Sequence, residues 1–234
     1  MRSNTNFIHN QKSGLLDNIR ELVFGAQDGM VSTLGALTGI AIGSNNQFFI
    51  ILSGFVIVTV EAVSMGIGSY ISTKSVRDID KLKLEEEKSE LKKDPEREKK
   101  ELVQIYVKEG WSLLLAEEMA LEVSKNQNLF LREMAHRELG INKHPELPLR
   151  SAFFMFFSYV VWGFIPVLPY LFLPISSAII LSIGVTLISL FFLGSMTTKF
   201  TKRLWWKAGI EMFLIASIAV VVGLIVGNAV NFLL

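Results

Sequence analysis

Long apolar stretches alternate with polar segments along this chain. Five stretches have roughly the 20 mostly apolar residues that a membrane-spanning helix requires, and they are residues 21–43, 48–72, 151–171, 174–196 and 208–231. Residues 74–150, between the second and the third, hold 17 of the 22 acidic and 16 of the 23 basic residues. The pattern predicts an all-α membrane protein with five transmembrane helices and a soluble insertion, divided into residues 1–73, 74–150 and 151–234.

The composition agrees with this class of protein. Hydrophobic residues make up 50% of the chain and the mean hydropathy is +0.42, which is too apolar for an ordinary soluble domain of this size. The chain has no cysteine, so disulfides and thiolate metal sites are excluded. The polar N-terminal segment lacks the apolar core of a signal peptide. Without an organelle signal, we expect a bacterial inner (plasma) membrane, or a vacuolar membrane if the source is eukaryotic.

Basic residues outside the insertion lie at one side of the predicted membrane bundle. They precede the first span, and they fill the loop between the fourth and fifth spans (Arg2, Lys12, Arg20, Lys199, Lys202, Arg203 and Lys207). The loops on the other side carry no charge. The positive-inside rule therefore places the N-terminus and the insertion in the cytoplasm, and the C-terminus on the opposite side.

Glycines recur about every four residues in the first span and again in the fifth (Gly25, Gly29, Gly35, Gly39, Gly43, Gly223 and Gly227). Small residues at this spacing let membrane helices approach closely. Such packing serves either one subunit or the contact between two subunits. Since five helices make a thin enclosure for a polar path, we expect a homodimer with the path near the shared interface.

Two acidic residues lie well inside predicted spans. Asp28 lies in the first span and Glu61 lies midway along the second. A carboxylate near the bilayer centre costs roughly 2.5–3.5 kcal/mol, which makes it a candidate for an ion path. Ser32 follows Asp28 by four residues and Glu21 precedes it by seven, so these three form a polar stripe on one helix. The alternative is a buried acid satisfied by a neighbouring hydroxyl or by its own proton.

The insertion is expected to form a three-helix domain that begins as a continuation of the second span to about residue 92. Asp94-Pro95 is typical of an N-cap followed by proline at the first helical position. Three helices follow this continuation: the first ends at Gly110, Ser112 caps the second, and the third ends at Gly140.

Glutamates stand symmetrically on both sides of the turn at Asp94. Glu87 and Glu90 precede it and Glu98 and Glu101 follow it, each pair on one helix face. An antiparallel hairpin can bring the four carboxylates together, where they repel one another unless protons or cations bind. The alternative is a solvated charged hairpin.

A second candidate metal motif lies in the last helix of the insertion. Glu133 and His136 form an E-x-x-H step of the kind found in ferritin-like di-iron sites. Such a site requires a second step, which the chain does not contain.

Two motifs carry a resemblance to a known family. The stretch RELVFGAQDGMVSTLGALTGIA, followed by EAVSMGIGSYIS, resembles the vacuolar iron transporter family, which includes yeast-type calcium/manganese/iron vacuolar transporters and bacterial members. The D-G-[LM]-V-[ST] and S-M-G-x-G steps are specific in combination, and the basic KRLWWKAG entry to the fifth span agrees.

The resemblance implies a homodimer that exchanges ferrous iron, and often manganese, for protons. By position it assigns Asp28 and Met65 as the membrane metal residues, with Asp17 and Glu21 at the cytoplasmic mouth. It places an insertion metal site on six residues (Glu87, Glu90, Glu98, Glu101, Met134 and Glu138). The family's glutamate eight residues before the methionine is replaced by Ile57 here, and Glu61 is the candidate substitute.

We therefore predict a proton-coupled transporter that exports ferrous iron, manganese or both from the cytoplasm, with Zn²⁺ as a possible substitute cargo. Carboxylates with one thioether favour iron or manganese over magnesium and calcium. We expect no enzymatic activity, no permanently bound cofactor and no nucleic-acid partner. The alternatives are a membrane-anchored protein that sequesters or oxidises iron, and a passive divalent cation channel.

Overall fold

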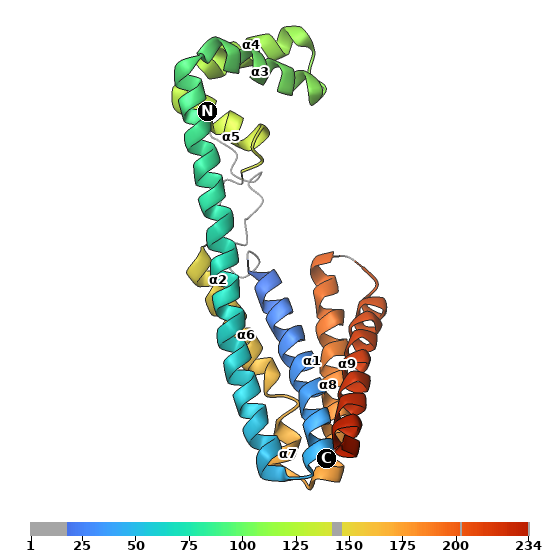
Figure 1. Cartoon of the computed structure of the whole chain (residues 1–234). Coiled ribbons are helices and arrows are strands. Elements are labelled where there is room, and N and C mark those ends of the chain that lie inside the picture. Colours follow the sequence, from blue (N-terminus) through green and yellow to red (C-terminus); the bar gives the residue numbers. More distant parts are fainter. Residues whose placement is uncertain (1–17, 142–146, 202, 234) are drawn as a thin grey trace, which may run out of the picture. The chain divides into compact units, whose positions relative to one another are not determined.

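The computed structural model describes residues 18–141, 147–201 and 203–233, which are helical almost throughout (Figure 1). The helices are α1 (Ile19–Ser44), α2 (Gln47–Lys93), α3 (Pro95–Lys108), α4 (Leu113–Ser124), α5 (Gln127–Arg137), α6 (Pro148–Gly163), α7 (Leu168–Phe172), α8 (Ile175–Thr201) and α9 (Trp205–Leu233). The predicted all-α class is confirmed for this part of the chain.

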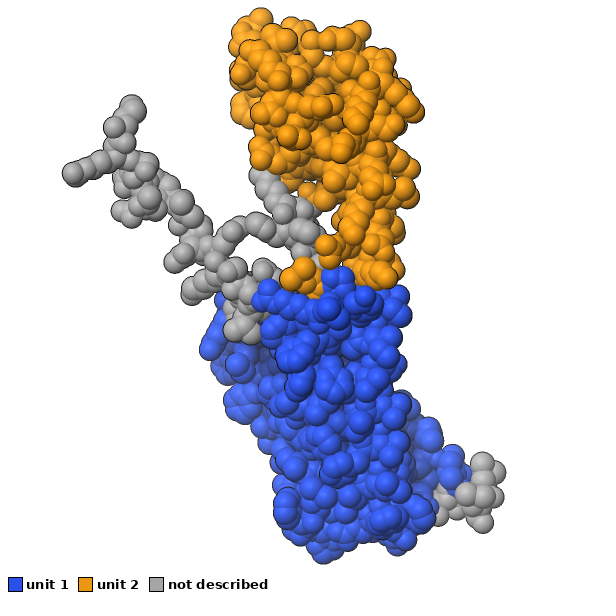
Figure 2. All heavy atoms as spheres, turned by 90° about the vertical axis from the view of Figure 1, so that its left-hand side faces the viewer, with its two compact units in different colours: residues 1–71, 148–234 blue, residues 72–147 orange. Residues whose placement is uncertain are grey.

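Two compact units make up the chain (Figure 2). The membrane unit comprises residues 1–71 and 148–234, and the insertion unit comprises residues 72–147. The continuous helix α2 contributes its apolar half to the first and its Lys/Glu-rich half to the second.

Within the described residues, three helices are long and apolar enough to cross a membrane: α2, residues 175–199 of α8, and residues 205–230 of α9. They correspond to the predicted second, fourth and fifth spans. Helix α1 has 26 residues, but its glycines and its polar side chains lower its hydropathy. The predicted first and third spans therefore remain predictions.

The stretch predicted as a single third span forms two helices. Helix α6 ends at Gly163, turns follow, and the short helix α7 begins at Leu168 with Pro169 in its first turn. Pro166 lies in the break, where it has no N–H to continue a helix. Its carbonyl oxygen accepts a hydrogen bond from Ser182 Oγ of α8 at 2.7 Å, so the broken segment is held against the next helix.

Helix α1 packs against α6, α8 and α9 in the membrane unit (Figure 1). Its glycines make this contact close: a Cβ atom at Gly29 would lie 2.7 Å from the carbonyl oxygen of Tyr159 in α6. A Cβ atom at Gly39 would lie 3.0 Å from the carbonyl oxygen of Gly223 in α9. The glycine stripe thus packs helices within one chain, which is one of the two roles that its spacing allows.

The insertion unit is held together by capped helix ends and a small apolar core. Asp94 accepts a hydrogen bond from the backbone N–H of Arg97 at 3.1 Å, and Asn126 caps α5 through the N–H groups of Asn128 and Leu129. Residues from α2 to α5 form the core (Leu91, Leu102, Tyr106, Ala116, Ala120, Phe130 and Met134). The chain therefore bends at Asp94, and α3 runs across the end of α2 (Figure 1).

Candidate functional site

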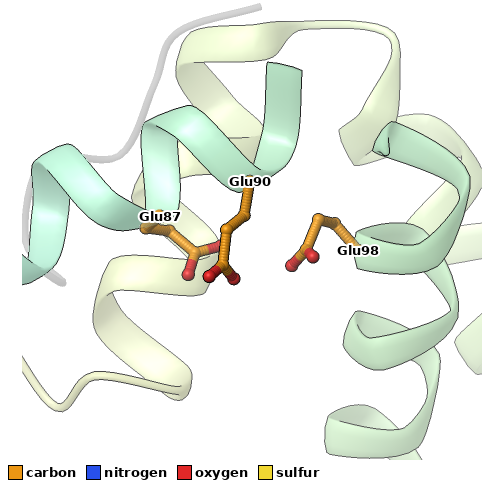
Figure 3. A group of neighbouring side chains, drawn as sticks. All are labelled: Glu87, Glu90 and Glu98. Atoms are coloured by element: carbon orange, nitrogen blue, oxygen red, sulfur yellow. The ribbon is translucent and has the colours of Figure 1, made fainter. Parts of the chain in front are cut away.

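The glutamates on both sides of the Asp94 turn converge in the insertion unit. Glu87 and Glu90 lie on the last turns of α2, and Glu98 lies on the first turn of α3 (Figure 3). One carboxylate oxygen from each residue lies within 4.8 Å of the others. The three carboxylates therefore converge at the bend, although α3 crosses the end of α2 and does not run antiparallel to it as the predicted hairpin requires (Figure 1).

Burial raises the free-energy cost of ionising the carboxyl groups of this cluster. Glu87 and Glu98 are almost fully buried, and Glu87 Oε1 has no hydrogen-bond partner among the described residues. Desolvation and, in decreasing order of importance, the neighbouring carboxylates of Glu138, Glu98, Glu90 and Glu101 together raise the pKa of Glu87 to about 7. Five carboxylates therefore share one electrostatic environment.

The other members of the predicted insertion site lie around the three central glutamates. Burial, followed by the charges of Glu101 and other glutamates, also raises the pKa of Glu98 and of Glu138. Met134 is fully buried in the apolar core that contains Leu91 and Leu102, one residue after Glu90 and Glu101 respectively. The carboxylates offer several oxygens, which suit a divalent cation, while the structure describes Met134 as part of the apolar core.

The E-x-x-H step in α5 belongs to a different set of contacts. Glu133 Oε2 accepts a hydrogen bond from Arg137 Nε at 2.7 Å, and Arg137 also pairs with Glu109 at the end of α3. The Arg137 guanidinium lies 4.8 Å from the centre of the Tyr106 ring. Glu133 thus holds α5 to α3 through Arg137, while His136 is exposed. This arrangement gives no support to a di-iron site.

Four polar side chains from three helices meet in the membrane unit: Asp28 and Ser32 of α1, Glu61 of α2 and Tyr159 of α6. Ser32 Oγ donates a hydrogen bond to Glu61 Oε2 at 2.9 Å, and the Tyr159 hydroxyl donates to the same oxygen. The Ser32 and Tyr159 hydroxyls lie 2.5 Å apart. Asp28 lies close enough for its carboxylate and that of Glu61 to repel each other. We call these four residues the membrane polar cluster.

An apolar groove of about 860 Å³ runs along α1 and α9 in the same unit. Small and aliphatic residues line most of it, including Gly35 and Gly39 of α1 and Val222 and Val226 of α9. Asp28 and Ser32 also line it and contribute its main polar groups. The membrane polar cluster therefore has one side open to the groove.

The remaining predicted membrane residues lie near this cluster on the same helices. Met65 is partly buried one turn after Glu61. Glu21 is 1% exposed in the first turn of α1; its Oε1 lies 3.7 Å from Arg20 Nε, and its Oε2 has no hydrogen-bond partner within the described ranges. Asp17, the other predicted mouth residue, lies outside the described residues.

Comparison with known proteins identifies the family of this chain. The model of the VIT family matches residues 19–228, nearly the whole chain. The chain belongs to the VIT family. It is 30% identical over 203 residues to vacuolar iron transporter 1 of Arabidopsis thaliana, covering 86% of this chain and 81% of that protein. The vacuolar iron transporter of Centaurea cyanus is 30% identical over 207 residues, covering 87% and 84%, and that of Plasmodium falciparum is 27% identical over 223 residues, covering 90% and 81%.

Sequence reasoning missed one member of the polar cluster in this VIT-family chain. Tyr159 stands in the apolar run FFSYVVWG, where a single tyrosine is unremarkable for a membrane helix. Glu61 itself indicated that such a donor should exist. A glutamate inside a membrane requires a hydrogen-bond donor, and no basic residue lies near Glu61 in the sequence.

The insertion cluster of this VIT-family protein predicts a pH-dependent response to metal. A carboxyl whose pKa is raised from 4.5 to about 7 stabilises the folded state below pH 4.5, and this stabilisation is lost as the pH rises through 7. Without metal, the packing of α3 against the end of α2 should thus open more readily at about pH 8 than at about pH 5. Mn²⁺ should restore protection at about pH 8 and have little effect at about pH 5, where protons occupy the carboxylates.

Hydrogen exchange of the full-length protein, corrected for the intrinsic pH dependence of exchange, measures this effect in peptides covering residues 85–105. Peptides from α4 act as an internal control, because α4 contributes no glutamate to the cluster. Protection that is the same with and without Mn²⁺ at about pH 8 would contradict a metal site between α2 and α3.

Proposed function

We propose that this VIT-family protein transports divalent metal ions, ferrous iron or manganese or both, out of the cytoplasm in exchange for protons. The observation that carries the proposal is the pair of acids in the membrane unit, Asp28 and Glu61, of which Asp28 lines an apolar groove. Neither acid takes part in an ion pair of the described residues. Two close carboxylates in an apolar surrounding require a proton or a cation to balance their charge.

The two sites have different parts in the proposed cycle. The insertion cluster, with Glu87, Glu90 and Glu98 at its centre, captures metal from the cytoplasm. Asp28 and Met65 then bind the ion within the membrane, with Asp17 and Glu21 at the cytoplasmic mouth. Since a carboxylate binds a metal ion only after its proton has left, alternation between the two is a minimal basis for exchange.

The relatives support iron as a cargo, because the three similar proteins are named vacuolar iron transporters. The proposed topology has five transmembrane helices, with α1 as the first and the broken pair α6 and α7 as the third. The basic loop before α9 and the insertion lie on the cytoplasmic side.

The groove along α1 and α9 supports a homodimer. A long apolar surface with few polar groups is suited to a second copy of the chain or to lipid, and Asp28 on its wall would be poorly placed against lipid. We propose that a second copy covers the groove and places two Asp28 residues near the shared interface. Because the chain has no cysteine, a single cysteine introduced at Val226 should cross-link two copies, and monomer alone after oxidation would count against the dimer.

Met65 provides a test of metal choice. Met65→Ala removes the only proposed soft ligand in the membrane, so Fe²⁺ transport at low concentration should fall about 10-fold, the lower end of the range for perturbed metal sites. Mn²⁺, which prefers oxygen ligands more strongly, should be affected less. Uptake rates of the two ions into proteoliposomes give the comparison. A drop in thermal stability with unchanged Fe²⁺ transport would assign Met65 to packing alone.

Metal flux into proteoliposomes tests the proposed function against its alternatives. With the lumen at lower pH than the outside, Mn²⁺ entry should be several-fold faster than with equal pH on both sides. A passive channel would give the same flux under both conditions. A protein that only sequesters or oxidises iron would bind metal but carry none into the lumen, and either result would reject proton-coupled transport.

A further inference from the structure

Tyr159 is a polar residue of α6 that neither sequence motif includes. Its side chain is fully buried, and a buried tyrosine hydroxyl normally has a hydrogen-bond partner. Here the hydroxyl donates to Glu61 Oε2 of α2 and lies 2.5 Å from Ser32 Oγ of α1. One hydroxyl thus joins three helices that are far apart in the sequence.

Close backbone packing holds Tyr159 in place relative to α1. A Cβ atom at Gly29 would lie 2.7 Å from the Tyr159 carbonyl oxygen and 3.3 Å from its Cα atom, so α1 and α6 touch at this residue. The residue before it, Ser158, donates a hydrogen bond to the carbonyl oxygen of Leu22 at 2.6 Å. The position of the tyrosine ring is therefore fixed from the α1 side.

Helix α2 contacts α6 on both sides of Tyr159. A Cβ atom at Gly163, one turn later, would lie 3.3 Å from Val58 of α2. A Cβ atom at Gly66 of α2 would lie 3.3 Å from Phe156, nearly one turn earlier. Glu61 lies between Val58 and Gly66, so the two contacts hold its backbone at the level of the tyrosine.

We propose that Tyr159 is a positioning residue for Glu61 and, with Ser32, holds it as the second carboxylate of the membrane transport site, facing Asp28. Both hydrogen bonds use Oε2, and no hydrogen bond within the described part of the chain uses Oε1. One oxygen is thus fixed to the frame of α1 and α6, and the other remains as a ligand for a cation. This inference rests on the proposed transport function and adds a role that the two motifs do not contain.

The test compares Mn²⁺ uptake by Tyr159→Phe with that by Tyr170→Phe. Both tyrosines are fully buried and both substitutions remove one hydroxyl, but Tyr170 lies in α7, outside the membrane polar cluster. Tyr159→Phe should raise the half-saturating Mn²⁺ concentration about 10-fold, as loss of an outer partner does at metal sites. Its maximal rate should stay within about twofold of the original, and Tyr170→Phe should change neither quantity.

A double-mutant cycle separates positioning from a general structural effect. If Tyr159 acts through Glu61, Tyr159→Phe should have no further effect on the half-saturating concentration in a Glu61→Gln background. Ser32→Ala, which removes the other donor to the same oxygen, should shift that concentration in the same direction. It serves as the second test if Tyr159→Phe does not fold.

The outcomes distinguish the two proposals. If the unmodified protein carries no metal, the transport function is wrong and this inference is wrong with it. If it carries metal while both the Tyr159 and Ser32 variants match it, the transport function stands and Tyr159 has no positioning role. Equal effects of Tyr159→Phe with and without Glu61 would also overturn the inference, because the tyrosine would then act independently of that residue.

Discussion

Replacement of Asp28 by asparagine is expected to abolish metal transport. The amide keeps the shape of the side chain but cannot carry the charge that binds a divalent ion. Even changes to outer partners reduce metal affinity 10–100-fold, so loss of this carboxylate should lower the rate of Mn²⁺ uptake by about 100-fold or more. Asp28 lines the groove beside Ser32, so its replacement removes the acidic group from the groove wall.

The same substitution should leave the protein folded. A carboxylate in an apolar region is a cost to stability, and a neutral amide relieves it, so the melting temperature of metal-free protein should be equal or higher. Glu211→Gln is the matched control. Glu211 is an exposed acid near the start of α9, paired with Arg203 at 3.4 Å, and its loss should change transport less than about twofold. Near-normal uptake by Asp28→Asn would remove Asp28 from the transport path.

Combined replacement of Glu90 and Glu98 by glutamine should remove most metal binding from the insertion unit. These residues contribute two of the three carboxylate oxygens that lie within 4.8 Å of one another. Glu87, left with fewer charged neighbours, cannot hold a divalent ion alone. Calorimetric titration of the full-length protein with Mn²⁺ should show the loss of the sites that are sensitive to low pH.

The same double variant should change the metal concentration needed for transport more than the maximal transport rate. The membrane polar cluster is untouched, so the maximal rate should remain within about twofold, while the half-saturating Mn²⁺ concentration should rise about 10-fold or more. Glu117→Gln with Glu118→Gln removes the same charge from exposed positions on α4 and should have no such effect. Equal Mn²⁺ affinity in the two double variants would mean that the glutamate cluster is a solvated charged face.

Much of the fold could be predicted because apolar runs and charge density divide this chain sharply. The start of α3 was predictable because Asp94-Pro95 has both capping and conformational signals, and the structure shows the cap bond to Arg97. The break between α6 and α7 was not predicted, since Pro166 lies inside a stretch whose hydropathy suits a single span. Hydropathy measures the free energy of transferring a segment from water into lipid. It does not report where the helix within that segment is broken.

Sequence spacing predicted some features of the candidate site and left others open. Spacing could place Glu87 and Glu90 on one face, but only packing could set the rotation that turns them toward Glu98. The core around Leu91 and Leu102 supplies that rotation, because these apolar neighbours must face inward. Tyr159 could not be found from sequence spacing, since it meets Glu61 across 98 residues. Contacts between distant helices depend on their packing, which no local pattern determines.

The most direct test of the central claim is the movement of protons driven by a metal gradient alone. Proteoliposomes containing a pH-sensitive dye, with equal pH on both sides and the membrane potential clamped, are given Mn²⁺ on the outside. If metal and protons exchange at this protein, Mn²⁺ entry will raise the lumen pH, and Asp28→Asn will show neither change. Entry of Mn²⁺ with no change in lumen pH would contradict proton-coupled transport.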